Sequence, residues 1–232
     1  MTLNVAFAAL VTGAVIAQGA PAQSNAAAIK ESLAANQAKL RTYSWVETTQ
    51  VTRKGEVKKD EQKQCYYGAD GKVQKTAMAG AAAAPAKPSG GGGGKRGGGV
   101  KERVVENKVD EMKDYMEKVV ALVHEYVPPD PQKIGAAESA GNVSKGAPGL
   151  TVKNYVKPGD LLAIGFDPAA KQLTSYTVQS FVEKPKEDDV KLVVTFGKLE
   201  DGTRYAQQTV LDVAAKKLQV KITNSGYKKA GL

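Results

Sequence analysis

The stretch from Asp160 to Tyr227 constrains the fold most, because it is a series of strand patterns with no helical segment between them. Apolar residues recur at every second position in five runs: 161–166, 176–182, 190–196, 205–213 and 217–223. A period of two buries one face of a strand and exposes the other. Turn residues such as Asp, Pro and Gly separate the runs, so the pattern predicts hairpins in an antiparallel sheet.

Two of these turns resemble each other. Phe166–Leu173 and Leu211–Leu218 both pass from Asp through two alanines to Lys and back to an apolar residue. The likeness covers only the turns and not a full repeat period, so it indicates one hairpin solution used twice rather than duplicated binding loops.

The first 22 residues differ from the rest of the chain. They carry no charge, 5–16 are mostly small or apolar, and Ala20 and Ala22 give the small residues that a signal peptidase requires. The sequence therefore predicts a cleavable signal at 1–22 and a periplasmic or secreted protein. Residues 23–232 are then enough for one domain with a sizeable core. Cys65 is the only cysteine, and a half-buried small residue within a strand, a disulfide between chains or a reactive thiol all fit it.

Before the C-terminal strands, the pattern changes several times. A helix is expected at 26–40, a strand at 43–52, and a second strand at 56–67 whose many charges suit an exposed sheet edge. Residues 77–99 are rich in Ala, Pro and Gly and predict a disordered insertion. Their glycines do not match a phosphate-binding loop, which needs Ser or Thr after the Gly-Lys pair.

The clearest helix is expected at 101–126. Apolar residues from Val105 to Tyr126 follow spacings of three and four, and further apolar positions widen the stripe enough to pack on a sheet. A coiled coil is the alternative interpretation. Asp130-Pro131 predicts the start of a short second helix, which Gly141 ends, and 141–149 reads as a loop before a strand at 150–156.

The residue types for catalysis or metal binding are scarce. With one His and one Cys, the chain does not predict a zinc site, and His124 fits the surface of the long helix. Ser225 and Lys228 match a short serine–x–x–lysine pattern, but without its companion motifs. The net charge of +9 is spread along the chain, which suits an anionic envelope surface and not a nucleic-acid groove. We expect the protein to have no enzyme activity, no cofactor and no nucleic-acid partner, and we do not expect it to be an integral membrane protein.

Two segments carry a resemblance to a known family: Leu40–Val46, at the start of the first strand, and the hairpin Phe166–Leu173. The expected elements follow one another as a signal segment, a helix, strands, one or two helices and an antiparallel meander. In this order and in these two segments, the chain resembles the periplasmic lipoprotein-carrier (LolA-like) superfamily. The plan is also similar to that of uncharacterised exported bacterial proteins. The resemblance implies an incomplete β-barrel whose concave apolar face is closed by helices and admits acyl chains. The Gly-rich insertion and the charged strand at 56–67 depart from the family plan.

The sequence thus predicts an α+β fold, with a curved antiparallel sheet covered on its concave face by helices. We expect a lipid, a lipoprotein acyl chain or another hydrophobic ligand to bind between sheet and helices. The alternative is a non-catalytic envelope interaction or structural module whose interior is filled by its own side chains. The candidate ligand-binding residues are Trp45, Met112, Met116, Leu162, Ile164, Phe166, Leu192, Val194 and Phe196.

Overall fold

The structure is a computed structural model of the chain, and it describes residues 25–78, 99–146 and 149–229, with the backbone alone for 99–109. The expected signal at 1–22 lies outside the described residues. The expected insertion at 77–99 also lies outside them for most of its length. At its two ends, however, Ala77 is the last residue of a strand and Gly99 is the first residue of a helix.

Three helices and ten strands make up the described chain. In order they are α1 (Asn25–Leu40), β1 (Tyr43–Arg53), β2 (Glu56–Tyr67), β3 (Val73–Ala77), α2 (Gly99–Tyr126), α3 (Pro131–Ser139), β4 (Val143–Gly146), β5 (Gly149–Lys153), β6 (Leu161–Asp167), β7 (Gln172–Phe181), β8 (Asp189–Lys198), β9 (Arg204–Val213), η1 (Ala214–Lys216) and β10 (Leu218–Lys229). The strand β4 corrects the expected loop at 141–149, and β3 was not expected.

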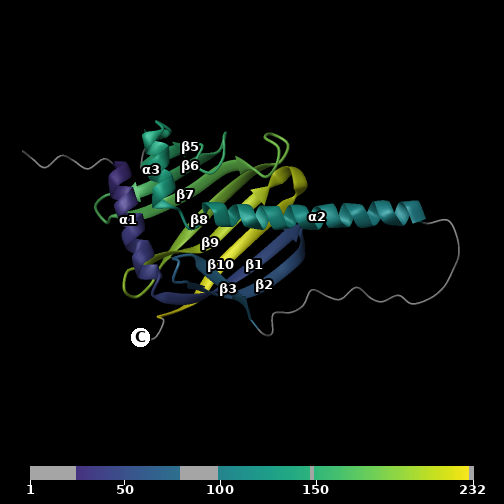
Figure 1. The fold of residues 1–232 in the computed structure, drawn as a ribbon, viewed down its shortest axis with the longest axis horizontal. Helices are drawn as coiled ribbons and strands as arrows, with labels where there is room; N and C mark the ends of the chain where they lie inside the picture. Colours follow the sequence, from purple (N-terminus) through teal and green to yellow (C-terminus); the bar gives the residue numbers. More distant parts are fainter. Residues whose placement is uncertain (1–24, 79–98, 147–148, 230–232) are drawn as a thin grey trace, which may run out of the picture.

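The strands form one antiparallel sheet in the order β3-β2-β1-β10-β9-β8-β7-β6-β5-β4. The sheet is curved and open (Figure 1). All neighbours are hairpin partners except β1 and β10, the first long strand and the last. The predicted fold class, α+β with a curved antiparallel sheet and helices on one face, is confirmed.

Alternation along the strands gives the sheet an inner face and an outer face. In β8, Val190, Leu192 and Val194 are buried while Lys191, Val193 and Thr195 are exposed, as the period of two predicts. The buried positions of β5–β10 join residues from all three helices in one apolar core. The helices therefore cover the inner face.

The inner face has two parts that differ in chemistry. The apolar half, formed by β5–β10, consists almost entirely of core side chains. The polar half, formed by β1–β3, carries Glu47, Thr49, Lys59, Glu61, Lys63, Cys65 and Lys75 on the same face, as the strand register shows. Only Val51 of these three strands belongs to the core.

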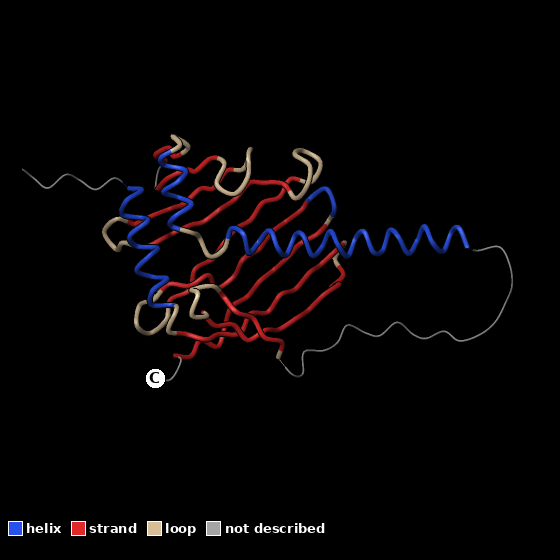
Figure 2. The backbone as a smooth tube through the Cα atoms, in the orientation of Figure 1, coloured by secondary structure: helices blue, strands red, loops and turns tan. Residues whose placement is uncertain are grey.

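The helices cover the two halves unequally. The helices α1 and α3 pack side by side over the apolar half, where Ile29, Leu33 and Ile134 enter the core. The helix α2 runs across the sheet, and its N-terminal part extends beyond the strands (Figures 1 and 2). Packing on the sheet is therefore correct for the C-terminal part of α2, where Val119 and Val123 are fully buried.

Two tyrosines fasten α2 to turns of the sheet. The Tyr126 hydroxyl donates to Asp160, at 2.6 Å, and Tyr115 lies 3.4 Å from a carboxylate oxygen of Asp188. Both aspartates are buried, and each also accepts hydrogen bonds from backbone N–H groups of its own turn. Tyr115 and Tyr126 are eleven residues apart, close to three helical turns, so both face the sheet.

The two similar turns do share a conformation. Lys171, between β6 and β7, and Lys217, between β9 and β10, both have positive φ angles, of 51° and 49°. In the first turn, Asp167 Oδ1 accepts from the backbone N–H groups of Ala169 and Ala170. Both loops have four residues and end with the positive φ angle, but the sequence match pairs Lys171 with Lys216 and not with Lys217. The turns are therefore alike in shape, while the sequence likeness is one residue out of step with that shape.

The strand β2 is exposed, as predicted, but it is only partly an edge. Its second half, from Lys63 to Tyr67, pairs with β3. Among the described residues, the part from Glu56 to Glu61 pairs only with β1, so the charged end of the strand is the free edge. In the part of the chain that the structure describes, no helix is long and apolar enough to cross a membrane.

Candidate functional site

The nine candidate residues do not line one common space. Leu162, Ile164, Phe166, Leu192 and Val194 are all at most 5% exposed and belong to the closed apolar core. Met112 and Met116 line a cleft beside α2, Phe196 lines a groove beneath α1, and Trp45 lies in an aromatic cluster. The nine residues are therefore divided among the closed core, the cleft, the groove and the aromatic cluster.

The first cavity, which we call the α1 groove, has a volume of about 290 Å³. It lies between α1, the prolines after α2, and the strands β7–β9. Its lining residues are Ala28, Glu31, Ser32, Leu33, Ala35, Asn36, Gln37, Lys39, Leu40, Pro128, Pro129, Ala170, Lys171, Gln172, Leu173, Phe196, Gly202, Arg204, Tyr205 and Ala206. The groove is close to the lower end of the range typical of small-molecule sites, about 300–1,000 Å³.

Polar side chains hold α1 over this groove. Asn36 binds the backbone of Arg204 twice: its amide donates to the carbonyl at 2.6 Å and its oxygen accepts from the N–H at 2.9 Å. Ser32 donates to the Lys171 carbonyl, and Gln37 donates to the Pro129 carbonyl. These hydrogen bonds fix the position of α1, so a cavity can remain between this part of the helix and the strands beneath it.

The groove combines an apolar floor with a mainly cationic rim. Leu173 and Phe196 provide the floor, and Leu33 faces them from α1. Lys39, Lys171 and Arg204 provide positive charge, and Glu31 is the acidic residue of the lining. The Arg204 Nε donates to Gln172 at 2.9 Å, which orients the guanidinium at the rim. Such a site suits an apolar chain with a small anionic or polar head.

The second cavity, the α2 cleft, has a volume of about 950 Å³ and shares no lining residue with the α1 groove. It lies between the middle of α2 and the turns at the end of β1–β2 and β9–β10. Its lining residues are Arg53, Lys58, Glu111, Met112, Lys113, Asp114, Tyr115, Met116, Lys118, Glu183 and Lys216.

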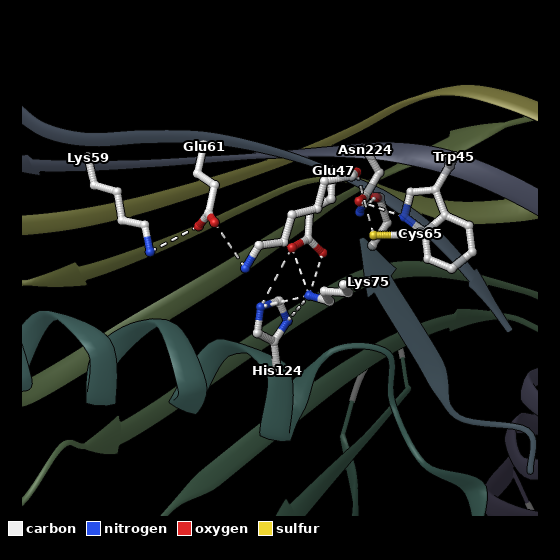
Figure 3. A network of polar contacts seen from close by, with 10 residues as sticks. Trp45, Glu47, Lys59, Glu61, Cys65, Lys75, His124 and Asn224 are labelled. Carbon is white, nitrogen blue, oxygen red and sulfur yellow. Dashed lines mark hydrogen bonds and ion pairs between the residues drawn. The ribbon is translucent and has the colours of Figure 1, made fainter. Parts of the chain in front are cut away.

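A polar network joins α2 to the polar half of the inner face (Figure 3). Lys75 Nζ lies 2.7 and 2.9 Å from the two carboxylate oxygens of Glu47, which is 7% exposed. The same ammonium lies 3.0 Å from Nε2 of His124, which points from α2 toward the strands. Partial burial and the nearby Lys75 charge lower the pKa of His124, so the ring accepts from Lys75 as a neutral imidazole.

The structure places Cys65 next to this network. Its side chain is fully buried, with Sγ 3.8 Å from the Lys63 carbonyl. Burial, and secondarily the Glu47 charge, raise the pKa of the thiol to about 11. A buried, protonated thiol is a poor nucleophile and cannot reach a second chain without opening of the sheet. The geometry therefore favours the interpretation as a small strand residue.

Trp45 occupies an aromatic cluster at the end of β1. Its ring is nearly parallel to that of Tyr227, with centroids 5.6 Å apart, and lies 5.5 Å from that of Tyr67. The indole N–H donates to Asn224. Tyr227 also contacts Tyr205, which lines the α1 groove. Trp45 is thus connected to the groove through two tyrosines and is distant from the methionines of the α2 cleft.

The remaining sequence candidates for chemistry are dispersed. Ser225 and Lys228 are exposed on β10, far from His124 on α2 along the chain and in separate elements. Sequence reasoning missed Arg53, Arg204, Glu47 and Lys75. Lys and Arg are common in this chain, and only the strand register places these particular ones on the inner face.

Comparisons with known proteins identify no family for the chain. No protein-family model matches the chain, and no curated protein does. Among solved structures, a DUF1329 family protein from Desulfovibrio piger aligns over 90% of this chain and 95% of its own, with 10% sequence identity and a TM-score of 0.40. At this identity and TM-score the likeness carries no functional argument.

Proposed function

We propose that this protein is a non-enzymatic protein of the periplasm or the exterior that binds the apolar chain of a lipid or of an acylated protein in the α1 groove. The observation that carries the proposal is the groove itself, in which Leu173 and Phe196 of the strands and Leu33 of α1 form an apolar interior beneath a helix held by polar side chains. The resemblance of the sequence to lipoprotein carriers, and its uncharged first 22 residues, support the same function.

This proposal changes which of the candidate residues should bind ligand. Phe196 is half-buried and lines the groove, whereas Phe166 is 4% exposed within the closed core. Replacing Phe166 with Asp would bury a charge in the core and unfold the protein whether or not a ligand binds. Only substitutions at the groove itself can therefore test binding.

Native mass spectrometry of the protein after lipid extraction is the first experiment. An acyl-bearing adduct that is lost on extraction and regained on adding oleate supports the proposal. Repeated absence of any adduct before extraction, together with no binding of oleate, contradicts it. That result favours the alternative, a non-catalytic interaction module, which the closed packing of Leu162, Ile164 and Leu192 already suits.

A matched pair of variants on α1 tests whether oleate binds in the α1 groove. Ala35 and Ala34 are neighbours and both exposed, but only Ala35 lines the groove. Ala35→Trp should fill the mouth of the groove and weaken oleate binding at least about tenfold, a cost of about 1.4 kcal/mol. Ala34→Trp should leave binding unchanged. The measurement is displacement of a neutral hydrophobic dye by oleate, and equal binding by both variants would place the ligand elsewhere.

A further inference from the structure

The α2 cleft differs from the α1 groove in what it offers a ligand. One wall is formed by α2, with Met112, Tyr115 and Met116 toward the cleft. The two methionines are half-buried against the core, so their flexible, polarisable side chains are available at the cleft surface. This wall suits an alkyl or acyl chain and not a purely polar ligand.

The opposite wall is cationic and comes from two turns of the sheet. Arg53 ends β1 and Lys216 belongs to the short helix η1 before β10. These two turns lie side by side, since the backbone N–H of Lys54 donates to the carbonyl of Lys217 at 2.8 Å. Lys216 Nζ also lies 5.7 Å from the centre of the Tyr115 ring, so this cation reaches across to the apolar wall.

Arg53 is the feature that points to a ligand. Its Nε is buried and has no hydrogen-bond partner within the described part of the chain. An unpartnered buried donor of a charged group is costly, and a guanidinium binds carboxylate and phosphate oxygens through two parallel N–H groups. Since the Nε itself is closed to solvent, an oxyanion in the cleft would bind the terminal N–H groups of the same guanidinium.

The other charged residues of the cleft leave this cation wall available. The acids of the lining are Glu111, Asp114 and Glu183. Glu183 is paired with Lys118, and Lys58 is paired with Glu56. The other two acids, Glu111 and Asp114, are on α2, on the wall opposite Arg53.

We propose that the α2 cleft is a second binding site, for an anionic amphiphile. Its phosphate or carboxylate contacts Arg53 and Lys216, and its apolar chain lies on Met112 and Met116. This site is independent of the α1 groove and does not require it to be occupied.

Methionine methyl NMR tests the proposal on the whole protein. Dodecyl phosphate, below its micelle concentration, is titrated into protein labelled at the methionine methyl groups. The signals of Met112 and Met116 should shift and saturate, while that of Met78, exposed at the end of β3, should not. Inorganic phosphate and dodecanol serve as the head alone and the chain alone, and each should bind at least about tenfold more weakly than dodecyl phosphate.

A matched pair of substitutions tests the role of Arg53. Arg53→Met keeps the apolar stem and removes the unpartnered donor, so the variant should fold and bind dodecyl phosphate at least about tenfold more weakly. Lys54→Met, in the same hairpin but outside the cleft lining, should bind normally. A cooperative urea unfolding transition like that of the unsubstituted protein shows that each variant is folded.

Each other outcome overturns the proposal. Equal binding of inorganic phosphate and dodecyl phosphate would show an anion site without a chain, and equal binding of dodecanol would show a purely apolar one. Unchanged binding by Arg53→Met would remove the oxyanion contact. The α1-groove variant Ala35→Trp should leave the methionine titration unchanged, so failure at one site is distinguishable from failure at the other.

Discussion

The apolar and polar halves of the inner face are parts of one sheet, yet they are stabilised differently. In the apolar half, side chains such as Leu192 and Ile164 fill the space beneath α1, α2 and α3. In the polar half, Glu47, Lys75 and His124 join strand to helix through charge and hydrogen bonds. The comparison teaches that the two cavities do not lie at the centre of the sheet, where the apolar residues are most concentrated. They lie at the margins, where polar contacts hold α1 and α2.

At these margins, cavities separate parts of α1 and α2 from the strands. A polar bridge such as Asn36 to Arg204 fixes the position of a helix without filling the volume beside it. Apolar side chains do the opposite, because they stabilise the fold through close contacts that fill the space between helix and sheet. The α1 groove and the α2 cleft both lie next to such polar bridges.

The largest effect is expected in the apolar half. Leu192→Ala should lower the free energy of unfolding by about 2–5 kcal/mol, because it leaves a cavity in a closed core. Val193→Ala, the next residue on the same strand but on the outer face, should change it by about 0.5 kcal/mol or less. Equilibrium urea denaturation measures both. Comparable losses would mean that the inner face is not the core.

The polar half should respond less, and only at its buried pair. Glu47→Gln weakens the pair with Lys75 at a site 7% exposed, and should cost about 1–3 kcal/mol in the same denaturation measurement. Glu61→Gln removes the more exposed pairs with Lys59 and Lys63 and should cost less than about 1 kcal/mol. If the double variant Glu47→Gln, Lys75→Met costs as much as the sum of the singles, the two residues are not coupled.

The smallest effect is expected from pH. Burial lowers the pKa of His124 below its ordinary value of 6.5 in the folded protein, and the groups that face it are Glu47, Lys75 and Lys63. The unfolded chain therefore binds the proton more readily as the pH falls through 6.5, and the free energy of unfolding decreases. The contribution is fully present above that pH. His124→Gln should flatten this part of the pH profile, and an unchanged profile would exclude His124 as its source.

Local patterns in the sequence were sufficient to predict the apolar half. Leu162, Leu192 and Val220 all fall on the buried face because burial alternation depends on neighbouring residues alone. The short strand β4 was not predicted because a strand of four residues that ends in glycine gives no periodic signal. The helices were predictable for the same reason as the long strands, since α2 carries its apolar stripe over many turns.

The sites could not be predicted in the same way, because they depend on register and fit. Trp45 is buried, but its neighbours Tyr227 and Asn224 follow from the pairing of β1 with β10. The two methionines were expected beside Leu192, whereas the crossing of α2 places them next to Arg53. Nothing in a sequence pattern states whether two packed elements leave a space between them.

The pairing of β1 with β10 also has a consequence for how the molecule reaches its native state. Trp45 and Asn224, joined by a hydrogen bond, are 179 residues apart in the chain. The strands β1–β3 reach the rest of the sheet only through β10, so this block must wait for the final residues to be synthesised. Closing so long a loop is slow compared with forming neighbouring hairpins. A chain that ends before residue 218 would therefore leave β1 without the strand that joins it to the rest of the sheet.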